Sequence, residues 1–223
     1  MKIIARIYTP YKEKFGIPRQ SGIADSIVSR IVFEPEYRRD EALTGIDGYS
    51  HLWLIWNFSK AEREEFSPTV RPPRLGGNKR MGVFATRAPF RPNPIGLSSV
   101  KLVSVEKTDN EGTVLFVRGA DMLDGTPIYD IKPYLPFTDS HPDATFGFAE
   151  DVMDYSLDVD FPEELLLKIE EKYREPIVKI LAEDPRPSYK KNSDKEYGML
   201  FADYEIFFTV TEAKLLVTKV RNI

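Results

Sequence analysis

The sequence predicts a mainly β chain in two parts: a strand-rich domain over about residues 1–140 and a smaller α+β domain over 145–223. The strand patterns before residue 140 are many, short and joined by turn signals. They do not alternate with helix patterns, which favours a barrel or rolled antiparallel sheet over a doubly wound parallel one. After residue 140 the pattern changes to a linker, helix signals and a closing hairpin.

The first half begins with strand patterns. Residues 2–8 (KIIARIY) are mostly apolar, and residues 26–34 (SIVSRIVFE) are rich in β-branched side chains. Residues 35–43 predict a helix, with proline in the first turn and Gly45 after its end. Residues 49–58 (YSHLWLIWNF) are apolar on both faces, so we expect a strand at the centre of a sheet.

A hairpin and an unusual loop follow. Residues 81–86 predict a short strand, while residues 98–106 and 113–119 predict the two strands of a hairpin. The DNEG sequence at 109–112 is typical of the turn between them. Residues 121–136 (DMLDGTPIYDIKPYLP) are expected to form a loop.

The second half mixes helix and strand signals. Residues 141–152 are typical of a linker. Residues 160–164 (DFPEE) combine an aspartate cap, a first-turn proline and acidic side chains, so a helix is expected to start there and continue through 165–173. A shorter helix is expected at about 175–182, and residues 205–220 predict a β-hairpin.

Composition narrows the functional classes. The 223 residues carry a net charge of −4, contain no cysteine and include two histidines. Disulfides, thiol nucleophiles and cysteine-based zinc sites are therefore excluded, and we expect no metal. The N-terminal apolar run is too short for a signal peptide, and none approaches the ~18 residues of a membrane span. We therefore expect a cytoplasmic protein without membrane contact.

Residues 71–99 (RPPRLGGNKRMGVFATRAPFRPNPIGLSS) form a cationic stretch without a carboxylate. Prolines and glycines restrict its backbone and let a ligand approach closely. Arginine binds phosphate or carboxylate through paired hydrogen bonds, so the stretch predicts an anion site. The alternative is a solvated surface loop. Its cations are Arg71, Arg74, Lys79, Arg80, Arg87 and Arg91.

The residues alone leave the chemistry broad. The sequence has no dinucleotide, nucleotide-triphosphate, zinc-protease or serine-hydrolase signature. What remains is the cationic stretch and a loop with three carboxylates, at Asp121, Asp124 and Asp130. This combination indicates a protein that binds a nucleotide-like or nucleic-acid ligand, with or without catalysis.

Four segments resemble the TsaA-like family, whose characterised members are called TrmO: YKEKFGIPRQSG, DGYSHLWLIW, RPPRLGGNKRMGVFATRAPFRPNPIGLS and DMLDGTPIYDIKPYLP. The resemblance extends through DPRPSYKK and the closing hairpin. It implies a single-sheet β-barrel and an S-adenosylmethionine-dependent tRNA methyltransferase. The implied target is N6 of threonylcarbamoyladenosine, next to the anticodon of threonine tRNAs. It also implies a homodimer with the cofactor site near the subunit interface.

The resemblance assigns cofactor contacts to three loops and to positions in the cationic stretch. One position departs from the family pattern, because Ser59-Lys60 stands where members carry His-Gln, and this places one edge of the pocket in doubt if side chains make those contacts. The expected cofactor-binding residues are Pro18, Arg19, Gln20, Ser59, Lys60, Arg87, Leu97, Asp121, Met122, Leu123, Asp124, Gly125 and Thr126.

The group that removes the N6 proton is left unassigned. His51, Asp124 and Tyr134 are candidates, with Asp130 as a further carboxylate. Each has a structural alternative: a hydrogen-bonded histidine, an aspartate that forms a turn and a core tyrosine. Tyr134 is also a candidate for stacking on a base.

The expected tRNA contacts are cationic. Arg91 is our choice for the threonyl carboxylate, and a solvated loop is the alternative for Lys190 and Lys191. A non-catalytic RNA-binding module and a methyltransferase with another acceptor are the competing functions; an intact cofactor pocket argues against the first. The expected tRNA-binding residues are Arg71, Arg74, Lys79, Arg80, Arg91, Lys190 and Lys191.

Overall fold

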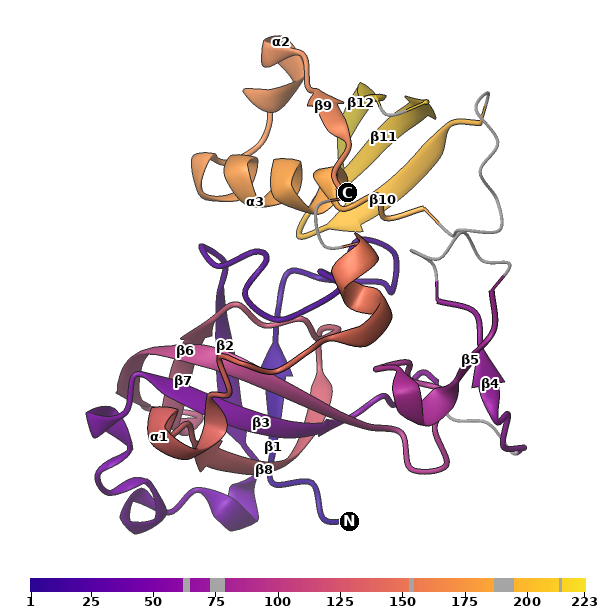
Figure 1. Ribbon diagram of the computed structural model, residues 1–223. Coiled ribbons are helices and arrows are strands. Elements are labelled where there is room, and N and C mark those ends of the chain that lie inside the picture. Colours follow the sequence, from indigo (N-terminus) through magenta and orange to yellow (C-terminus); the bar gives the residue numbers. More distant parts are fainter. Residues whose placement is uncertain (62–64, 73–78, 153–154, 187–194, 213) are drawn as a thin grey trace.

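The computed structural model describes residues 1–61, 65–72, 79–152, 155–186, 195–212 and 214–223. Strands dominate this part of the chain, as the sequence predicts. Figure 1 shows the strands in two groups, a large sheet built from the first half of the chain and a smaller sheet from the last third, with helices beside the smaller one.

The larger sheet is a closed antiparallel barrel in the order β1-β2-β7-β6-β3-β8. The ring closes because β8 pairs with both β3 and β1. Side chains alternate along each strand, and in β3 this turns Leu52, Leu54 and Trp56 into the buried interior. The six strands are β1 (Ala5–Tyr8), β2 (Val28–Phe33), β3 (His51–Asn57), β6 (Ile95–Thr108), β7 (Gly112–Arg118) and β8 (Thr126–Pro133).

Three expectations about the first half need correction. Residues 121–136 were expected to be a loop, but β8 occupies half of them. The helix expected at 35–43 is two 3₁₀ turns, η1 (Pro35–Tyr37) and η2 (Asp40–Leu43), separated by the extended Arg39. Neither turn buries a residue, so no apolar face stabilises a longer helix.

The strand expected at 81–86 is shorter than predicted. Only β5 (Met81–Gly82) is extended, and it pairs with β4 (Thr69–Val70). The next residues form the 3₁₀ turn η5 (Val83–Ala85), in which Val83 is buried and its neighbour Phe84 is exposed. Because the β4–β5 pairing covers only two residues of each strand, the chain can turn at residue 83, where the Val83 side chain is buried.

The second sheet has the order β10-β11-β12-β9, with β9 parallel to β12. The predicted closing hairpin is β11 and β12. The prediction of one continuous helix from residue 160 to 173 was wrong. Asp160 belongs to β9, α2 is only four residues long, and α3 begins at Glu171. Their bounds are β9 (Asp158–Asp160), α2 (Glu163–Leu166), α3 (Glu171–Ala182), β10 (Tyr197–Phe201), β11 (Tyr204–Thr211) and β12 (Lys214–Asn222). Residues 136–152 hold α1 (Pro136–Asp139) and η6 (Gly147–Val152).

The first loop, residues 9–27 between β1 and β2, joins the two sheets. Tyr11 and Ile27 are buried in the same apolar cluster as the second sheet, and the Tyr11 and Phe201 rings meet edge to face at 5.7 Å. Gly16 has φ +94°, and a Cβ added there would lie 2.5 Å from the Met199 sulfur, so this loop needs glycine to approach β10. A chain segment that precedes β2 therefore completes the apolar core of the second sheet. The division into domains at 140–145 stays a prediction.

Candidate active site

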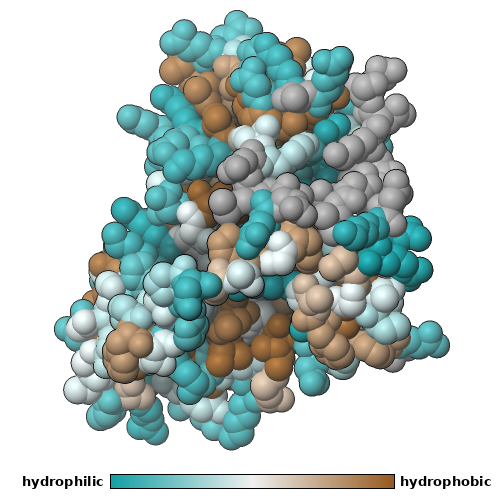
Figure 2. Space-filling view, viewed as in Figure 1, coloured by the Kyte–Doolittle hydropathy of each residue, from teal (hydrophilic) through white to brown (hydrophobic). Residues whose placement is uncertain are grey.

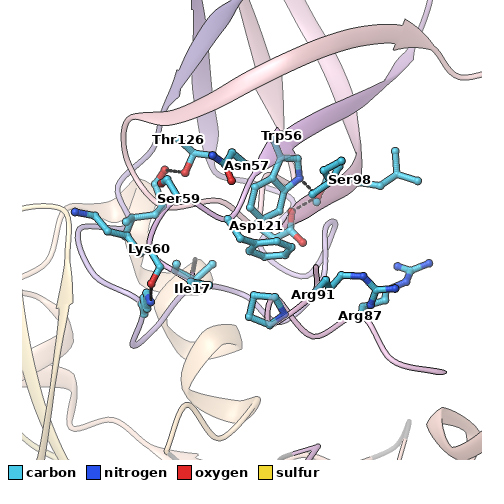
Figure 3. A pocket seen from close by; sticks show the side chains of 18 of the residues that line it. Ile17, Trp56, Asn57, Ser59, Lys60, Arg87, Arg91, Ser98, Asp121 and Thr126 are labelled. Atoms are coloured by element: carbon cyan, nitrogen blue, oxygen red, sulfur yellow. Dashed lines mark hydrogen bonds between the residues drawn. The ribbon is translucent and has the colours of Figure 1, made fainter. Parts of the chain in front are cut away.

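A cavity of about 590 Å³ opens where the first loop meets the ends of β3 and β6. Its volume falls within the range of small-molecule sites, about 300–1,000 Å³. Four segments supply its walls: 14–20, 56–61, 86–98 and 121–126. Figure 3 shows Trp56, Ser98 and Asp121 together, with Ser59 and Lys60 on one side and Arg87 and Arg91 on the other.

One wall is a directed chain of hydrogen bonds. The Trp56 indole Nε1–H donates to Ser98 Oγ at 3.0 Å, and Ser98 Oγ–H donates to Asp121 Oδ1 at 2.6 Å. Because indole nitrogen is only a donor, Ser98 must accept from it and can direct its own proton to the carboxylate. Burial raises the pKa of Asp121, and the Ser98 hydrogen bond opposes this only in part.

Strand register creates this wall. Trp56 lies opposite Gly96 across the β3–β6 ladder, and a Cβ on Gly96 would lie 2.2 Å from the indole ring. The indole also packs against Phe58, with ring centroids 4.2 Å apart. The indole can therefore lie flat over β6 and reach Ser98 only because residue 96 has no side chain.

The arginines that line the cavity are held by named acceptors. Arg87 Nη1 donates to Gln20 Oε1 at 2.9 Å, which joins the cationic stretch to the first loop. Arg91 Nη1 donates to the backbone oxygens of Val83 at 3.0 Å and Thr86 at 2.7 Å. Both side chains therefore also order the loops that carry them.

Arg19 connects the cavity to the C-terminal region. Its Nη2 donates to the backbone oxygen of Asp184 at 2.6 Å. The Asp184 carboxylate makes a bidentate ion pair with Arg186, at 2.7 and 2.9 Å, and accepts from the Tyr155 hydroxyl at 2.9 Å. Asp184 has φ +52°, a left-handed conformation that few residues other than glycine adopt. These hydrogen bonds hold it there.

Ten of the thirteen expected cofactor-binding residues line the cavity: Pro18, Arg19, Gln20, Ser59, Lys60, Arg87, Leu97, Asp121, Leu123 and Thr126. The other three are not among the residues that line it. Met122 is fully buried, Asp124 accepts from Lys12 Nζ at 2.9 Å and from the Thr9 amide at 3.0 Å, and the Gly125 carbonyl accepts from Arg6. At the departing position, the Lys60 carbonyl accepts a hydrogen bond from Lys14 Nζ.

The three candidate bases are not among the described residues that line the cavity. The His51 Nδ1 lies 2.9 Å from Ser50 Oγ, and its ring meets the Tyr134 ring at 6.2 Å. Tyr134 also packs against Trp53, at 5.5 Å. Asp130 pairs with Lys132 at 3.1 Å. The His51 contact is the hydrogen bond of its structural alternative, whereas Tyr134 is half-buried and is not a core residue. The Asp124 carboxylate holds the Thr9 amide and Lys12 of another loop. Which group removes the N6 proton stays a prediction.

The expected tRNA contacts divide into three groups. Arg71, Lys79 and Arg80 are exposed, and Arg80 Nε donates to Thr69 Oγ1 at 2.9 Å. Arg91 lies in the cavity wall instead. Arg74, Lys190 and Lys191 lie outside the described residues.

Sequence reasoning missed several lining residues, among them Trp56, Ser98 and Phe90. Trp56 looked like an ordinary residue of an apolar strand, and its role depends on the pairing of β3 with β6. A bulky aromatic on one strand and a lone glycine on a neighbouring strand is the signal that could have suggested it.

The residues present fit S-adenosylmethionine. A carboxylate shielded in a cavity suits a cationic ligand, and Ile17, Phe90 and Leu97 supply apolar surface for an adenine or methionine side chain. Within the described ranges, no three His, Asp or Glu side chains are grouped to hold a metal ion. No helix of this same part is both long and apolar enough to cross a bilayer.

Two family models match the chain in consecutive parts. Residues 6–140 match the model of the tRNA-methyltransferase O N-terminal domain, and residues 154–223 match that of the TrmO C-terminal domain. A tRNA (adenine(37)-N6)-methyltransferase of Escherichia coli K12 is 42% identical over 218 residues, 94% of this chain and 92% of that protein. Its counterpart in Eikenella corrodens is 45% identical, over 77% of this chain and 97% of that protein.

A solved structure supports the same assignment. The crystal structure of TrmO from Pseudomonas aeruginosa superposes with a TM-score of 0.75 at 32% identity, covering 99% of this chain and 97% of that one. Sequence and fold therefore agree over essentially the whole length. The chain belongs to the TrmO family.

Proposed function

We propose that this protein transfers a methyl group from S-adenosylmethionine to N6 of the adenine at position 37 of tRNA. The observation that carries the proposal is the cavity, which four parts of the chain line and which contains the carboxylate of Asp121. The names of the E. coli and Eikenella relatives support the reaction and its position. An RNA-binding module without catalysis would have no use for such a cavity.

The loops at 18–20, 59–60 and 121–126, together with Arg87 and Leu97, would hold the methyl donor. When bound, this cofactor supplies a methyl group on a positively charged sulfur. The protein's task is to hold the acceptor nitrogen close to that methyl and in line with the bond that breaks. Such positioning supplies a large part of the acceleration in two-reactant steps.

Asp121 is our candidate for accepting the N6 proton. It lines the cavity, and burial raises the pKa of its carboxyl group, which makes its carboxylate a stronger base than an exposed aspartate. Ser98 and Trp56 keep one oxygen oriented. They would act as positioning residues.

The finer identity of the substrate is also a proposal. We propose threonylcarbamoyladenosine in threonine tRNA as the acceptor, a cytoplasmic homodimer as the working form, and Arg91 as the group that binds the threonyl carboxylate. The Nη1 group of Arg91 donates to two backbone oxygens. A guanidinium carries five N–H donors, so its remaining N–H groups can face a ligand. Sedimentation of the purified protein tests the dimer.

The test compares the wild type with Asp121→Asn and Ser98→Ala, and uses Asp130→Asn as a control outside the cavity. Calorimetry measures S-adenosylmethionine affinity, and label transfer to tRNA measures kcat as a function of pH. Asp121→Asn should lower kcat about 10²–10⁴-fold. The Ser98 hydrogen bond lowers the pKa of Asp121, so Ser98→Ala should shift the acidic limb of the kcat–pH profile to higher pH. If cofactor binds but no tRNA is labelled by the wild type, the proposed function is wrong. A loss confined to cofactor affinity in Asp121→Asn would make Asp121 a binding residue only.

A further inference from the structure

Two exposed phenylalanines form a stacked pair next to the cavity. The ring centroids of Phe66 and Phe84 are 6.1 Å apart, with 26° between their planes. Phe66 is 52% exposed and Phe84 72%. A single exposed phenylalanine is common on protein surfaces, whereas two rings that stack on each other form an apolar patch of the kind that marks interaction sites. We call Phe66 and Phe84 the aromatic platform.

The platform is held in place by its surroundings. Val83 is buried directly beside Phe84, and its amide donates to the Pro68 carbonyl at 2.9 Å. The Thr86 hydroxyl donates to the Val83 carbonyl, which also accepts from Arg91. Phe84 thus stands on a turn fixed from both sides, so its exposure is built into the loop.

The platform adjoins the cavity through Arg91. This guanidinium lies 5.7 Å from the Phe84 ring centroid and also lines the cavity. Arg71, Lys79 and Arg80 flank the same β4–β5 hairpin and are exposed, while Glu65 precedes Phe66. Figure 2 shows hydrophobic and strongly hydrophilic residues side by side over the region where Figure 1 labels β4 and β5.

We propose that the aromatic platform stacks on unpaired RNA bases adjacent to the nucleotide whose base enters the cavity. The inference rests on the proposed function and adds the surface that receives the neighbouring nucleotides. Flat apolar rings surrounded by cations match single-stranded nucleic acid, which offers base faces and phosphates together. A base that leaves its stack to reach a cavity loses stacking with its neighbours. The platform replaces that stacking.

A second copy of this chain is the other possible cover for the rings. A two-fold symmetric dimer that placed this patch at its axis would set Arg80 and Arg91 against the same cations of the partner copy. Such like-charge contacts are unfavourable. Charge complementarity therefore favours RNA over a second copy whose own patch meets this one at the axis.

The test uses substitutions that separate stacking from apolar contact. Phe84→Leu keeps an apolar side chain of similar size but removes the aromatic face, and Phe84→Trp enlarges that face. Phe66→Leu and the double variant complete the set. Phe137→Leu is the matched control, because Phe137 is 86% exposed on α1, which Figure 1 shows on the side of the barrel away from β4 and β5.

The measured quantities are the Kd for tRNA at several salt concentrations, S-adenosylmethionine affinity and sedimentation. Phe84→Leu should weaken tRNA binding about tenfold, and the double variant more. The salt slope should stay the same, because no phosphate contact is lost. Phe84→Trp should bind tRNA as the wild type does, or more tightly. Cofactor affinity and Phe137→Leu should match the wild type.

A fluorescent base, 2-aminopurine, placed next to the target nucleotide gives a direct readout. Its emission should stay quenched on the wild type and rise on Phe84→Leu. Unchanged tRNA affinity in the double variant would overturn the proposal, and so would a dimer that dissociates when Phe84 becomes Leu. A wild type that binds tRNA through the platform but transfers no methyl group would instead refute the proposed function.

Discussion

Substitution Arg186→Ala removes one partner of a buried ion pair. The side chains of Arg186 and Asp184 are 5% and 6% exposed, and two hydrogen bonds join them. The substitution leaves the Asp184 carboxylate shielded from water without its cation. Breaking such a pair costs about 3–5 kcal/mol, which for a chain of this size lowers Tm by roughly 6–20 °C.

The direction of the Asp184 pKa shift determines how the Tm loss should change with pH. Burial pushes the pKa of Asp184 upward, but the Arg186 guanidinium and the Tyr155 hydroxyl outweigh it, so the net pKa is lowered. In the wild type the ion pair therefore stabilises the fold fully above the ordinary aspartate pKa. This stabilisation is lost as the pH falls through the lowered pKa of Asp184. Without Arg186, burial dominates and raises this pKa. The Tm difference should then narrow as the pH falls from 7 toward about 4.

Thermal unfolding followed by circular dichroism at several pH values is the assay. Lys214→Ala is the control, because its pair with Asp160 is exposed and should leave Tm within about 2 °C of the wild type. Calorimetry should also show weaker S-adenosylmethionine binding in Arg186→Ala, since the Asp184 carbonyl holds Arg19. A Tm loss under about 3 °C, or one that is constant with pH, would refute the reasoning.

Other substitutions address the cavity and its surroundings. Gly96→Val should abolish cofactor binding, because its Cβ would meet the Trp56 ring at 2.2 Å, and calorimetry checks this. Lys79→Ala combined with Arg80→Ala should weaken tRNA binding, lower its salt slope by about 2 and spare cofactor affinity; equal losses of both would contradict separate sites. His51→Gln should keep kcat within about threefold in a label-transfer assay, since His51 lies outside the cavity lining; a larger loss would restore His51 as a candidate base.

Local patterns predicted most strands. The hairpins β6–β7 and β11–β12 were found because alternation and turn residues are encoded within a few positions. The prediction of a helix at 35–43 was wrong because local sequence does not determine how long a helix becomes. That length depends on tertiary burial of an apolar face, which η1 and η2 lack. β8 was missed because its two prolines and the Gly125 before it resemble a loop, although it pairs with β1 and β3.

The same distinction between local pattern and tertiary packing applies to the candidate site. Loops such as 18–20 and 121–126 carry local motifs, so their contribution to the cavity could be predicted. The Trp56–Ser98–Asp121 chain could not, because it depends on how β3 registers against β6. The contact between Arg19 and Asp184 joins residues 165 positions apart and depends on the first loop packing into the second core.

The most direct measurement is methyl transfer from labelled S-adenosylmethionine to two forms of threonine tRNA, one carrying threonylcarbamoyladenosine at position 37 and one carrying plain adenosine. Mass spectrometry of the digested product locates the methyl group. Our account predicts label at N6 of position 37 in the modified tRNA alone. Label in neither form, from protein that binds the cofactor, would contradict it.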